Sequence, residues 1–166
     1  GGMGRVISNG YDREDLRELT PFTVEKDALT FAYCGRLQAG RSLTPVYDAV
    51  RELISEGACD ASRFRFHYAG RQGADFLAEA EQAGFGSVAV NHGMLPRSGS
   101  LGLQRAADAL LVAVFNNERR KGVLTGKLLE YLMAGRPVLC CVTGKQPNSA
   151  ARQLVEQVEC GFCFEQ

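Results

Sequence analysis

Short apolar runs recur along the chain and predict buried β-strands. The run ALTFAYC shows the pattern best, because nearly every position is apolar or aromatic and Gly35 ends it. Strands that are apolar along most of their length are typical of a parallel sheet covered on both faces. We expect strands at residues 28–34, 64–69, 87–92, 109–115, 136–142 and 160–165.

Segments with apolar residues at helical spacing separate these runs. In the first, Thr44 is the expected N-cap, Pro45 stands at the first helical position and Gly57 ends the helix. Strict alternation predicts an α/β fold: a doubly wound, Rossmann-like parallel sheet of about six strands with helices on both faces. Such sheets bind ligands at the carboxyl ends of their strands, where the strand order reverses. We expect helices at residues 45–57, 74–84, 101–107, 126–135 and 148–158.

The composition is that of a soluble globular domain without a charge bias. Of the 166 residues, 45% are apolar and 23% charged, and 19 basic side chains balance 19 acidic ones. This balance argues against a nucleic-acid partner, so any anion site must be local. No apolar run approaches the roughly 20 residues that span a bilayer. Residues 1–4 lack the features of a signal peptide and are expected to be a cloning remnant or linker, with residues 5–166 forming one domain.

The six cysteines give no convincing metal or redox pattern. Cys34 and the Cys140-Cys141 pair lie inside apolar runs and are expected to be buried. Cys160 and Cys163 form the sole Cys-x-x-Cys pattern, without the second pair that a zinc site needs, so strand packing is the preferred interpretation. Unpaired thiols favour a reducing cytoplasm.

A loop rich in glycine and arginine, residues 35–42, follows the first strand. Gly35 and Gly40 allow close approach of the backbone to a ligand, and Arg36 and Arg41 offer rigid forks for phosphate oxygens. The loop is not the Gly-x-Gly-x-x-Gly fingerprint, so a dehydrogenase loses its main support. A solvated turn with surface arginines is the alternative interpretation.

The helix expected after the fourth strand begins with a second candidate anion site. Thr125 can cap it, and Gly126 leaves the first backbone N–H groups accessible, which together carry about half a positive charge. Lys127 adds a charge where cations are normally disfavoured, which suggests a nearby anion, and Leu128 follows it. Glu130 could accept hydrogen bonds from ribose hydroxyls. The alternative is an exposed Lys127–Glu130 pair worth roughly 0.2–0.5 kcal/mol.

The loop after the third strand is a weaker candidate. His92, Gly93, Met94 and Leu95 could offer backbone groups and apolar flanks to a nucleotide base. We do not expect His92 to be a catalytic base. His67 lies within a strand and is expected to be a packed, hydrogen-bonded core residue.

These segments together resemble the C-terminal, donor-binding domain of the GT-B glycosyltransferases, specifically the retaining family 4 (group 1). The most specific stretch is KLLEYLMAGRPV, residues 127–138, which resembles the family's Lys-x-x-Glu-Tyr, alanine, glycine, basic residue and Pro-Val signature. Two other stretches also resemble the family. Residues 7–12, ISNGYD, resemble its Asn-Gly-x-Asp turn after the interdomain linker. Residues 107–111, ADALL, resemble its Ala-Asp segment at the fourth strand. The resemblance covers nearly the whole chain.

The resemblance implies a role for each matched residue. Arg36 and Arg41 match the basic pair that holds the donor diphosphate, with Arg41 in place of the usual lysine. Glu130 matches the second of two family glutamates and would hold the ribose. The position of the first glutamate, in a loop that contacts the donor sugar, is Gly122 here, a departure for which Lys127 would partly compensate.

By resemblance, the whole protein is expected to be a retaining hexosyltransferase of glycan biosynthesis, bacterial and cytoplasmic, with peripheral attachment to the inner face of a membrane left open. This chain would bind the nucleoside diphosphate sugar, and a separate N-terminal domain would hold the acceptor. Fixed cations would stabilise the departing diphosphate without a metal or other cofactor, because no clustered Asp pattern is present. The expected catalytic residues are Arg36, Arg41 and Lys127, and the expected donor-binding residues are Gly35, Gly40, His92, Gly93, Met94, Leu95, Thr125, Gly126, Leu128 and Glu130.

Other functions on the same architecture remain alternatives. A nucleotide-sugar 2-epimerase-like enzyme would share the diphosphate site but would need acid and base residues that the sequence does not reveal. A non-catalytic nucleotide-binding module is the second alternative and a dehydrogenase the third. The base, the sugar, the acceptor and the oligomeric state are left open by the sequence.

Overall fold

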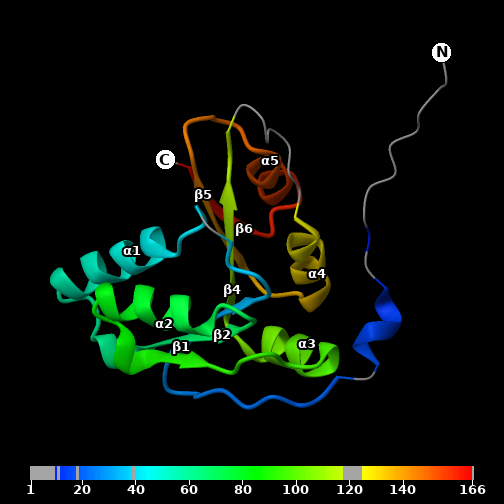
Figure 1. Ribbon diagram of the computed structural model, residues 1–166, viewed down its shortest axis with the longest axis horizontal. Helices are drawn as coiled ribbons and strands as arrows, with labels where there is room; N and C mark the ends of the chain where they lie inside the picture. The colour runs from blue at the N-terminus through cyan, green and yellow to red at the C-terminus, as the bar shows by residue number, and fades with distance from the viewer. Residues whose placement is uncertain (1–9, 11, 18, 39, 118–124, 166) are drawn as a thin grey trace.

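The computed structural model describes residues 10, 12–17, 19–38, 40–117 and 125–165. All six strands are parallel, in the order β3-β2-β1-β4-β5-β6, as the sequence predicts for a doubly wound α/β domain (Figure 1). The order reverses between β1 and β4, which places the ligand-binding crevice of this fold at their carboxyl ends. The strands are β1 (Leu29–Cys34), β2 (Phe64–Ala69), β3 (Ala89–Asn91), β4 (Ala109–Phe115), β5 (Val138–Thr143) and β6 (Gly161–Glu165).

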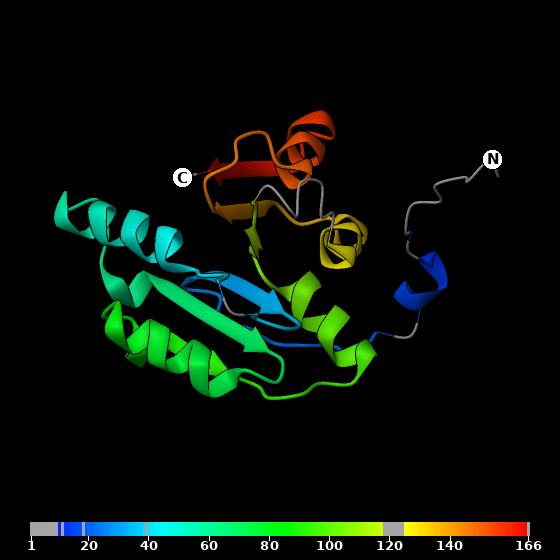
Figure 2. The same cartoon turned by 45° about the horizontal axis from the view of Figure 1, so that its top comes forward.

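Helices cover both faces of the sheet (Figures 1 and 2). The buried side chains of α1 and α2 pack with one face, in a core rich in Phe and Tyr, and those of α3, α4 and α5 pack with the other. None of the helices in the described ranges has the length and apolar character needed to cross a bilayer. The helices are α1 (Thr44–Ser55), α2 (Gly73–Gln82), α3 (Arg97–Ala106), α4 (Gly126–Ala134) and α5 (Ala150–Gln157), with short 3-10 turns η1 (Arg13–Leu16), η2 (Ala61–Arg63) and η3 (Gly86–Val88).

The start of α1 differs from the prediction. Thr44 is the first helical residue rather than the N-cap, and Leu43 takes the cap position without a side-chain hydrogen bond. The carboxylate of Glu79, from α2, accepts hydrogen bonds from the backbone N–H groups of Leu43 and Thr44 instead, at 2.8 and 3.1 Å. A negative charge is favourable at this end of a helix, so an internal anion already occupies the amino end of α1.

Two further boundaries were predicted wrongly. α3 begins at Arg97, four residues before the expected start, because the polar sequence of its first turn hides the helical period. β3 is confined to Ala89–Asn91, since η3 takes up the residues before it.

The buried cysteines and His67 lie as expected. Cys34, Cys140 and Cys141 are at most 4% exposed, and His67 is 4% exposed and hydrogen-bonded. Cys163 pairs in register with Cys140 across β5 and β6, and all six thiols are free.

Candidate functional site

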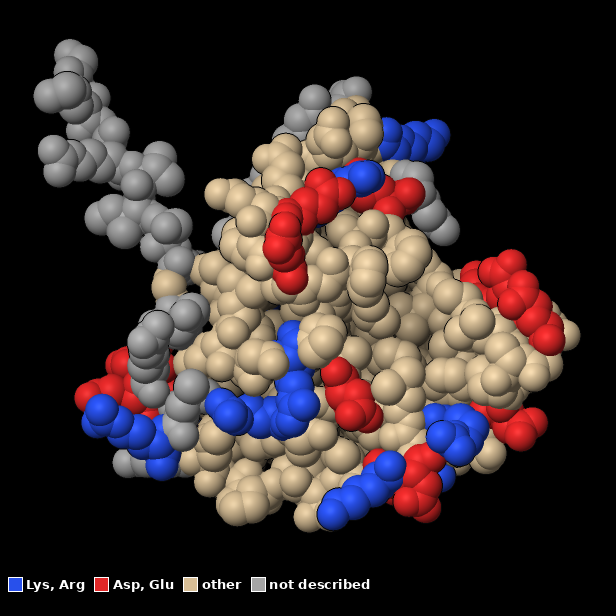
Figure 3. Space-filling view, turned by 180° about the vertical axis from the view of Figure 1, so that it is seen from behind, with Lys and Arg blue, Asp and Glu red and all other residues tan. Residues whose placement is uncertain are grey.

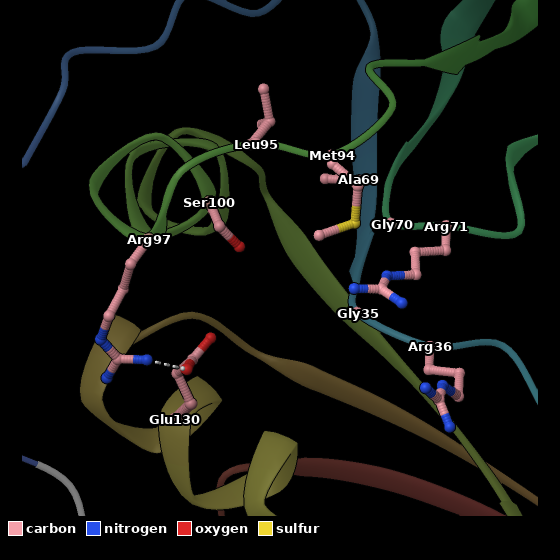
Figure 4. Close-up of a pocket in the computed structure, with 10 residues that line it drawn as sticks. All are labelled: Gly35, Arg36, Ala69, Gly70, Arg71, Met94, Leu95, Arg97, Ser100 and Glu130. Carbon is pink, nitrogen blue, oxygen red and sulfur yellow. Dashed lines mark hydrogen bonds and ion pairs between the residues drawn. The ribbon is translucent and has the colours of Figure 1, made fainter.

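A pocket of about 440 Å³ lies at the carboxyl ends of β1, β2 and β3, against the first turn of α3 and against Glu130 in the second turn of α4 (Figure 4). It adjoins the reversal of strand order between β1 and β4, where ligands bind in this fold. Four separate loops and helix ends contribute to it, which is why no single sequence motif describes it. Its lining residues are Gly35, Arg36, Ala69, Gly70, Arg71, Met94, Leu95, Arg97, Ser100 and Glu130.

The loop after β1 and the start of α4 meet in space. A Cβ atom added to Gly35, whose φ is 112°, would lie 3.2 Å from Cε of Lys127. Further along α4, the hydroxyl of Tyr131 accepts a hydrogen bond from the backbone N–H of Cys34 at 2.8 Å. These contacts hold the amino end of α4 against the end of β1, and only glycine fits at position 35.

The Lys127 side chain is partly exposed, but its ammonium group is buried. Its Nζ atom has no partner among the described residues and lies 3.6 Å from the centre of the Tyr33 ring. Burial, together with the nearby charge of Arg41, lowers the pKa of Lys127 to about 7. Lys127 is not among the residues that line the pocket. An anion bound beside its ammonium group would favour the charged form of the side chain.

The two arginines of the first loop have different surroundings. Arg36 lines the pocket, is exposed and forms no salt bridge with the described part of the chain. Arg41 does not line the pocket; its guanidinium interacts with the hydroxyl of Tyr33, beside Lys127. Gly40 also lies outside the pocket: its carbonyl accepts a hydrogen bond from Thr143 at 2.7 Å.

Glu130 faces the pocket with its carboxylate already held by α3. Its Oε2 accepts a hydrogen bond from Arg97 at 3.0 Å (Figure 4). Its Oε1 accepts one from the buried amide of Gln104 at 2.5 Å. Arg97 also forms a salt bridge with Asp15, in η1. An ionised carboxylate has about four lone-pair positions, so Glu130 keeps acceptor capacity for a ligand while its orientation is fixed.

The other residues predicted for the amino end of α4 contribute unequally. Thr125 takes the N-cap position, but its hydroxyl makes no cap hydrogen bond. Gly126 is exposed, and an added Cβ would meet no atom within 4 Å. Leu128 is fully buried in the core, so its side chain cannot reach a ligand in the pocket.

The loop after β3 divides into residues that line the pocket and residues that do not. Met94, which is 64% exposed, and Leu95 line it. His92 lies outside it: its Nε2 is 2.8 Å from Nδ1 of His67, and its ring packs edge-on against Phe22. Gly93 also stays outside, where its carbonyl accepts a hydrogen bond from the Gly70 N–H at 2.8 Å.

The sequence interpretation missed Arg71 and Arg97. Arg71 was detectable, because Gly70-Arg71 follows β2 as Gly35-Arg36 follows β1, and neighbouring parallel strands end at the same edge. Gly70 is required there, since an added Cβ would overlap the carbonyl oxygen of Gly35. Arg97 carried no signal, because the start of α3 was placed too late.

Two segments singled out in the sequence lie wholly or mostly outside the described residues. Gly122, at the position of the family's first glutamate, and most of the ISNGYD segment belong to the undescribed parts of the chain. Among the described residues, no group of three or more His, Cys, Asp or Glu side chains could hold a metal ion. Acidic and basic side chains are interspersed on the face shown in Figure 3.

No protein-family model matches the chain, and no curated protein matches it in sequence. Solved structures do share its fold. WaaG, described as a glycosyltransferase involved in lipopolysaccharide biosynthesis, is 18% identical and aligns with a TM-score of 0.53 over 86% of this chain and 35% of its own. The ADP-heptose lipopolysaccharide heptosyltransferase II of E. coli is 12% identical and aligns with a TM-score of 0.51 over 94% of this chain and 44% of its own.

The chain therefore spans less than half the length of either of these structures. Its six-stranded parallel sheet, with helices on both faces, is the Rossmann-like architecture expected from the alternating sequence pattern. The fold of this chain is that of a GT-B glycosyltransferase-like domain.

Proposed function

We propose that this chain is the C-terminal, donor-binding domain of a family 4 glycosyltransferase and binds a nucleoside diphosphate sugar in the pocket at the carboxyl end of the sheet. The observation that carries the proposal is the meeting of the Gly35-Arg36 loop with the end of α4 that bears Lys127 and Glu130. A separate N-terminal domain would bind the acceptor. This chain covers 35% of WaaG and 44% of the heptosyltransferase, which is consistent with a protein of two domains.

The charges of the pocket suit a diphosphate. Arg36 and Arg71 line it without an acidic partner among the described residues, and the ammonium group of Lys127 lies close to Gly35 without lining the pocket. Arginine forks bind phosphate oxygens in a bidentate manner, and the free N–H groups at the start of α4 add a partial positive charge. Glu130 then lies where a carboxylate could accept hydrogen bonds from the ribose.

The same arrangement would assist transfer of the sugar. Cleavage of the bond between the sugar and the diphosphate leaves negative charge on the departing phosphate oxygens. Fixed positive groups aimed at those oxygens stabilise this charge as it forms. Retention of the anomeric configuration, transfer of a hexose, independence of metals and a bacterial, cytoplasmic setting in glycan biosynthesis are further parts of the proposal.

Nucleotide binding tests the proposal directly. The chain is titrated with UDP, GDP, ADP and NAD while backbone amide signals are followed by NMR, which detects millimolar affinities. One of the three diphosphates should bind more tightly than NAD and shift residues around Gly35 and Gly126. Arg36→Ala should weaken this binding about tenfold, the usual size of a charge-assisted hydrogen bond. Arg63→Ala, an exposed arginine before β2, is the matched control.

The outcomes separate the proposed function from its alternatives. Tighter binding of NAD than of every diphosphate, or shifts confined to regions away from the pocket, would overturn the proposal. In the full-length enzyme, Arg36→Ala and Glu130→Ala should lower the transfer rate without unfolding the domain. Unchanged transfer kinetics in both variants would show that the donor site lies elsewhere, and diphosphate binding without any transfer by the full-length protein would favour a binding module.

A further inference from the structure

The carboxylate of Glu130 is held in place by Arg97, which lies outside both the loop at residues 35–42 and the start of α4. Arg97, the first residue of α3, donates from Nη1 to Oε2 of Glu130 at 3.0 Å. Gln104, two turns later on the same helix and fully buried, donates to Oε1 at 2.5 Å. One donor on each oxygen fixes both the position and the rotation of the carboxylate.

Arg97 is itself fixed by a second carboxylate. Its Nε lies 3.1 Å from Oδ2 of Asp15, and its Nη2 forms a salt bridge with the same oxygen. The two acids are partly exposed, at 29% for the Asp15 side chain and 25% for that of Glu130, and the Arg97 side chain between them is 56% exposed. With three of its donors committed to two carboxylates, Arg97 cannot turn toward a ligand without breaking a salt bridge. It therefore differs from Arg36 and Arg71, which face the same pocket without an acidic partner among the described residues.

We propose that Arg97 is a positioning residue for the donor site: it holds Glu130 in the orientation that receives the ribose hydroxyls. This inference rests on the proposed function. A free glutamate side chain loses much rotamer freedom when a ligand orders it, and a carboxylate ordered in advance avoids that loss. The geometry predicts that removing Arg97 weakens recognition of the ribose hydroxyls specifically, while the phosphate contacts remain.

The test compares each variant's affinity for two ligands that differ only in those hydroxyls. The probes are whichever of UDP, GDP and ADP binds tightest, and its 2′,3′-dideoxy analogue. The unmodified chain should prefer the ribose form by about tenfold, as for hydrogen bonds to a charged group. Arg97→Gln should reduce that preference by about three- to tenfold. Arg97→Lys should restore part of it, because lysine keeps the charge but not the fork.

Matched variants separate positioning from a general loss of structure. Arg105→Gln removes an exposed arginine from the last turn of the same helix and should leave the preference unchanged. Glu130→Gln should reduce the preference by itself, and adding Arg97→Gln to it should change little further. Asp15→Asn should cause a smaller loss than Arg97→Gln, since it acts on Glu130 only through Arg97.

The possible failures are distinct. An equal loss of affinity for both ligands in Arg97→Gln would make Arg97 a phosphate contact and overturn the inference. An unchanged preference in Arg97→Gln, or no preference in the unmodified chain, would also overturn it, while diphosphate binding at the pocket would leave the proposed function standing. No binding by any of the three diphosphates would overturn the proposed function and this inference together.

Discussion

Lys127 shows how one residue can be placed against its local preference. A cation at the amino end of a helix is unfavourable, and here the Nζ atom of Lys127 is also buried without a hydrogen-bond partner among the described residues. The contact with the Tyr33 ring offsets part of the cost. The remaining cost of burial, together with the nearby charge of Arg41, lowers the pKa of Lys127 to about 7, against 10.5 for an unperturbed lysine. A penalty of this kind at a pocket edge is typical of functional sites.

Replacing Lys127 should therefore stabilise the chain in a pH-dependent manner. Between pH 7 and 10.5 the unfolded chain binds a proton at Lys127 that the folded chain releases, so the stability of the unmodified chain rises with pH. Lys127→Met removes this penalty. Its free energy of unfolding should exceed that of the unmodified chain by on the order of 2–4 kcal/mol at pH 7, and the difference should shrink toward pH 10.5.

Urea denaturation at several pH values measures this difference. Lys145→Met, at an exposed position, is the control and should show no such pH-dependent gain. A Lys127→Met variant less stable than the unmodified chain at every pH would mean that the ring contact outweighs the cost of burial.

The segment before β1 and the helix α3 depend on each other. The backbone N–H of Thr20 donates to the carbonyl of Ser98 at 3.3 Å, and their hydroxyls lie 2.9 Å apart. Phe22 and Val24, further along the segment, pack against the core on this face of the sheet. The segment approaches so closely that a Cβ added at Gly102 would overlap the carbonyl of Thr20. The absence of a side chain at Gly102 thus allows the segment before β1 to lie directly against α3.

Two glycines of α3 should consequently respond in opposite ways to alanine. Gly102→Ala should displace the segment and lower the free energy of unfolding by about 1–3 kcal/mol, as overpacking does. A Cβ added at Gly99 would meet Pro96 at 3.7 Å and Leu95 at 3.8 Å, which are ordinary contact distances. The better helix propensity of alanine should therefore make Gly99→Ala raise the free energy of unfolding by about 0.5–1 kcal/mol. The midpoints of urea unfolding report both changes, and equal effects of the two substitutions would contradict the packing argument.

One part of the whole molecule leaves large apolar side chains in solvent. Phe162 and Phe164, on β6, are 69% and 55% exposed. They pair in register with Leu139 and Cys141, which face the core shared with α1 and α2. The sheet is therefore covered by helices over β1 and β2 but presents an apolar edge at β6, and exposed patches of this kind favour association.

Replacing both rings should make the chain more monomeric. The double variant Phe162→Ser, Phe164→Ser should self-associate less at high concentration, with a change in unfolding free energy within about 1 kcal/mol because the rings are exposed. Sedimentation velocity at increasing concentration measures the association. Leu53→Ser, a single exposed apolar residue on α1, is the control. Unaltered association of the double variant would show that this surface is not adhesive.

The alternation of apolar runs with helical periods was enough to predict the fold, because burial on both faces of a parallel sheet leaves a local pattern at every strand. It was also enough to bring two candidate motifs together. The loop at Gly35 follows β1 and the helix bearing Lys127 follows β4, and these neighbouring strands end at the same edge.

Contacts between segments far apart in the sequence determine which side chains face the pocket. Nothing in the local sequence indicates that the Glu79 carboxylate accepts hydrogen bonds from the backbone at the start of α1, that His92 turns toward His67, or that Arg97 donates to Glu130. Each interaction joins residues at least 25 positions apart. The direction of a side chain depends on what packs against it rather than on its neighbours in the chain. Periodicity could therefore indicate where the pocket lies, whereas packing determined which side chains face it.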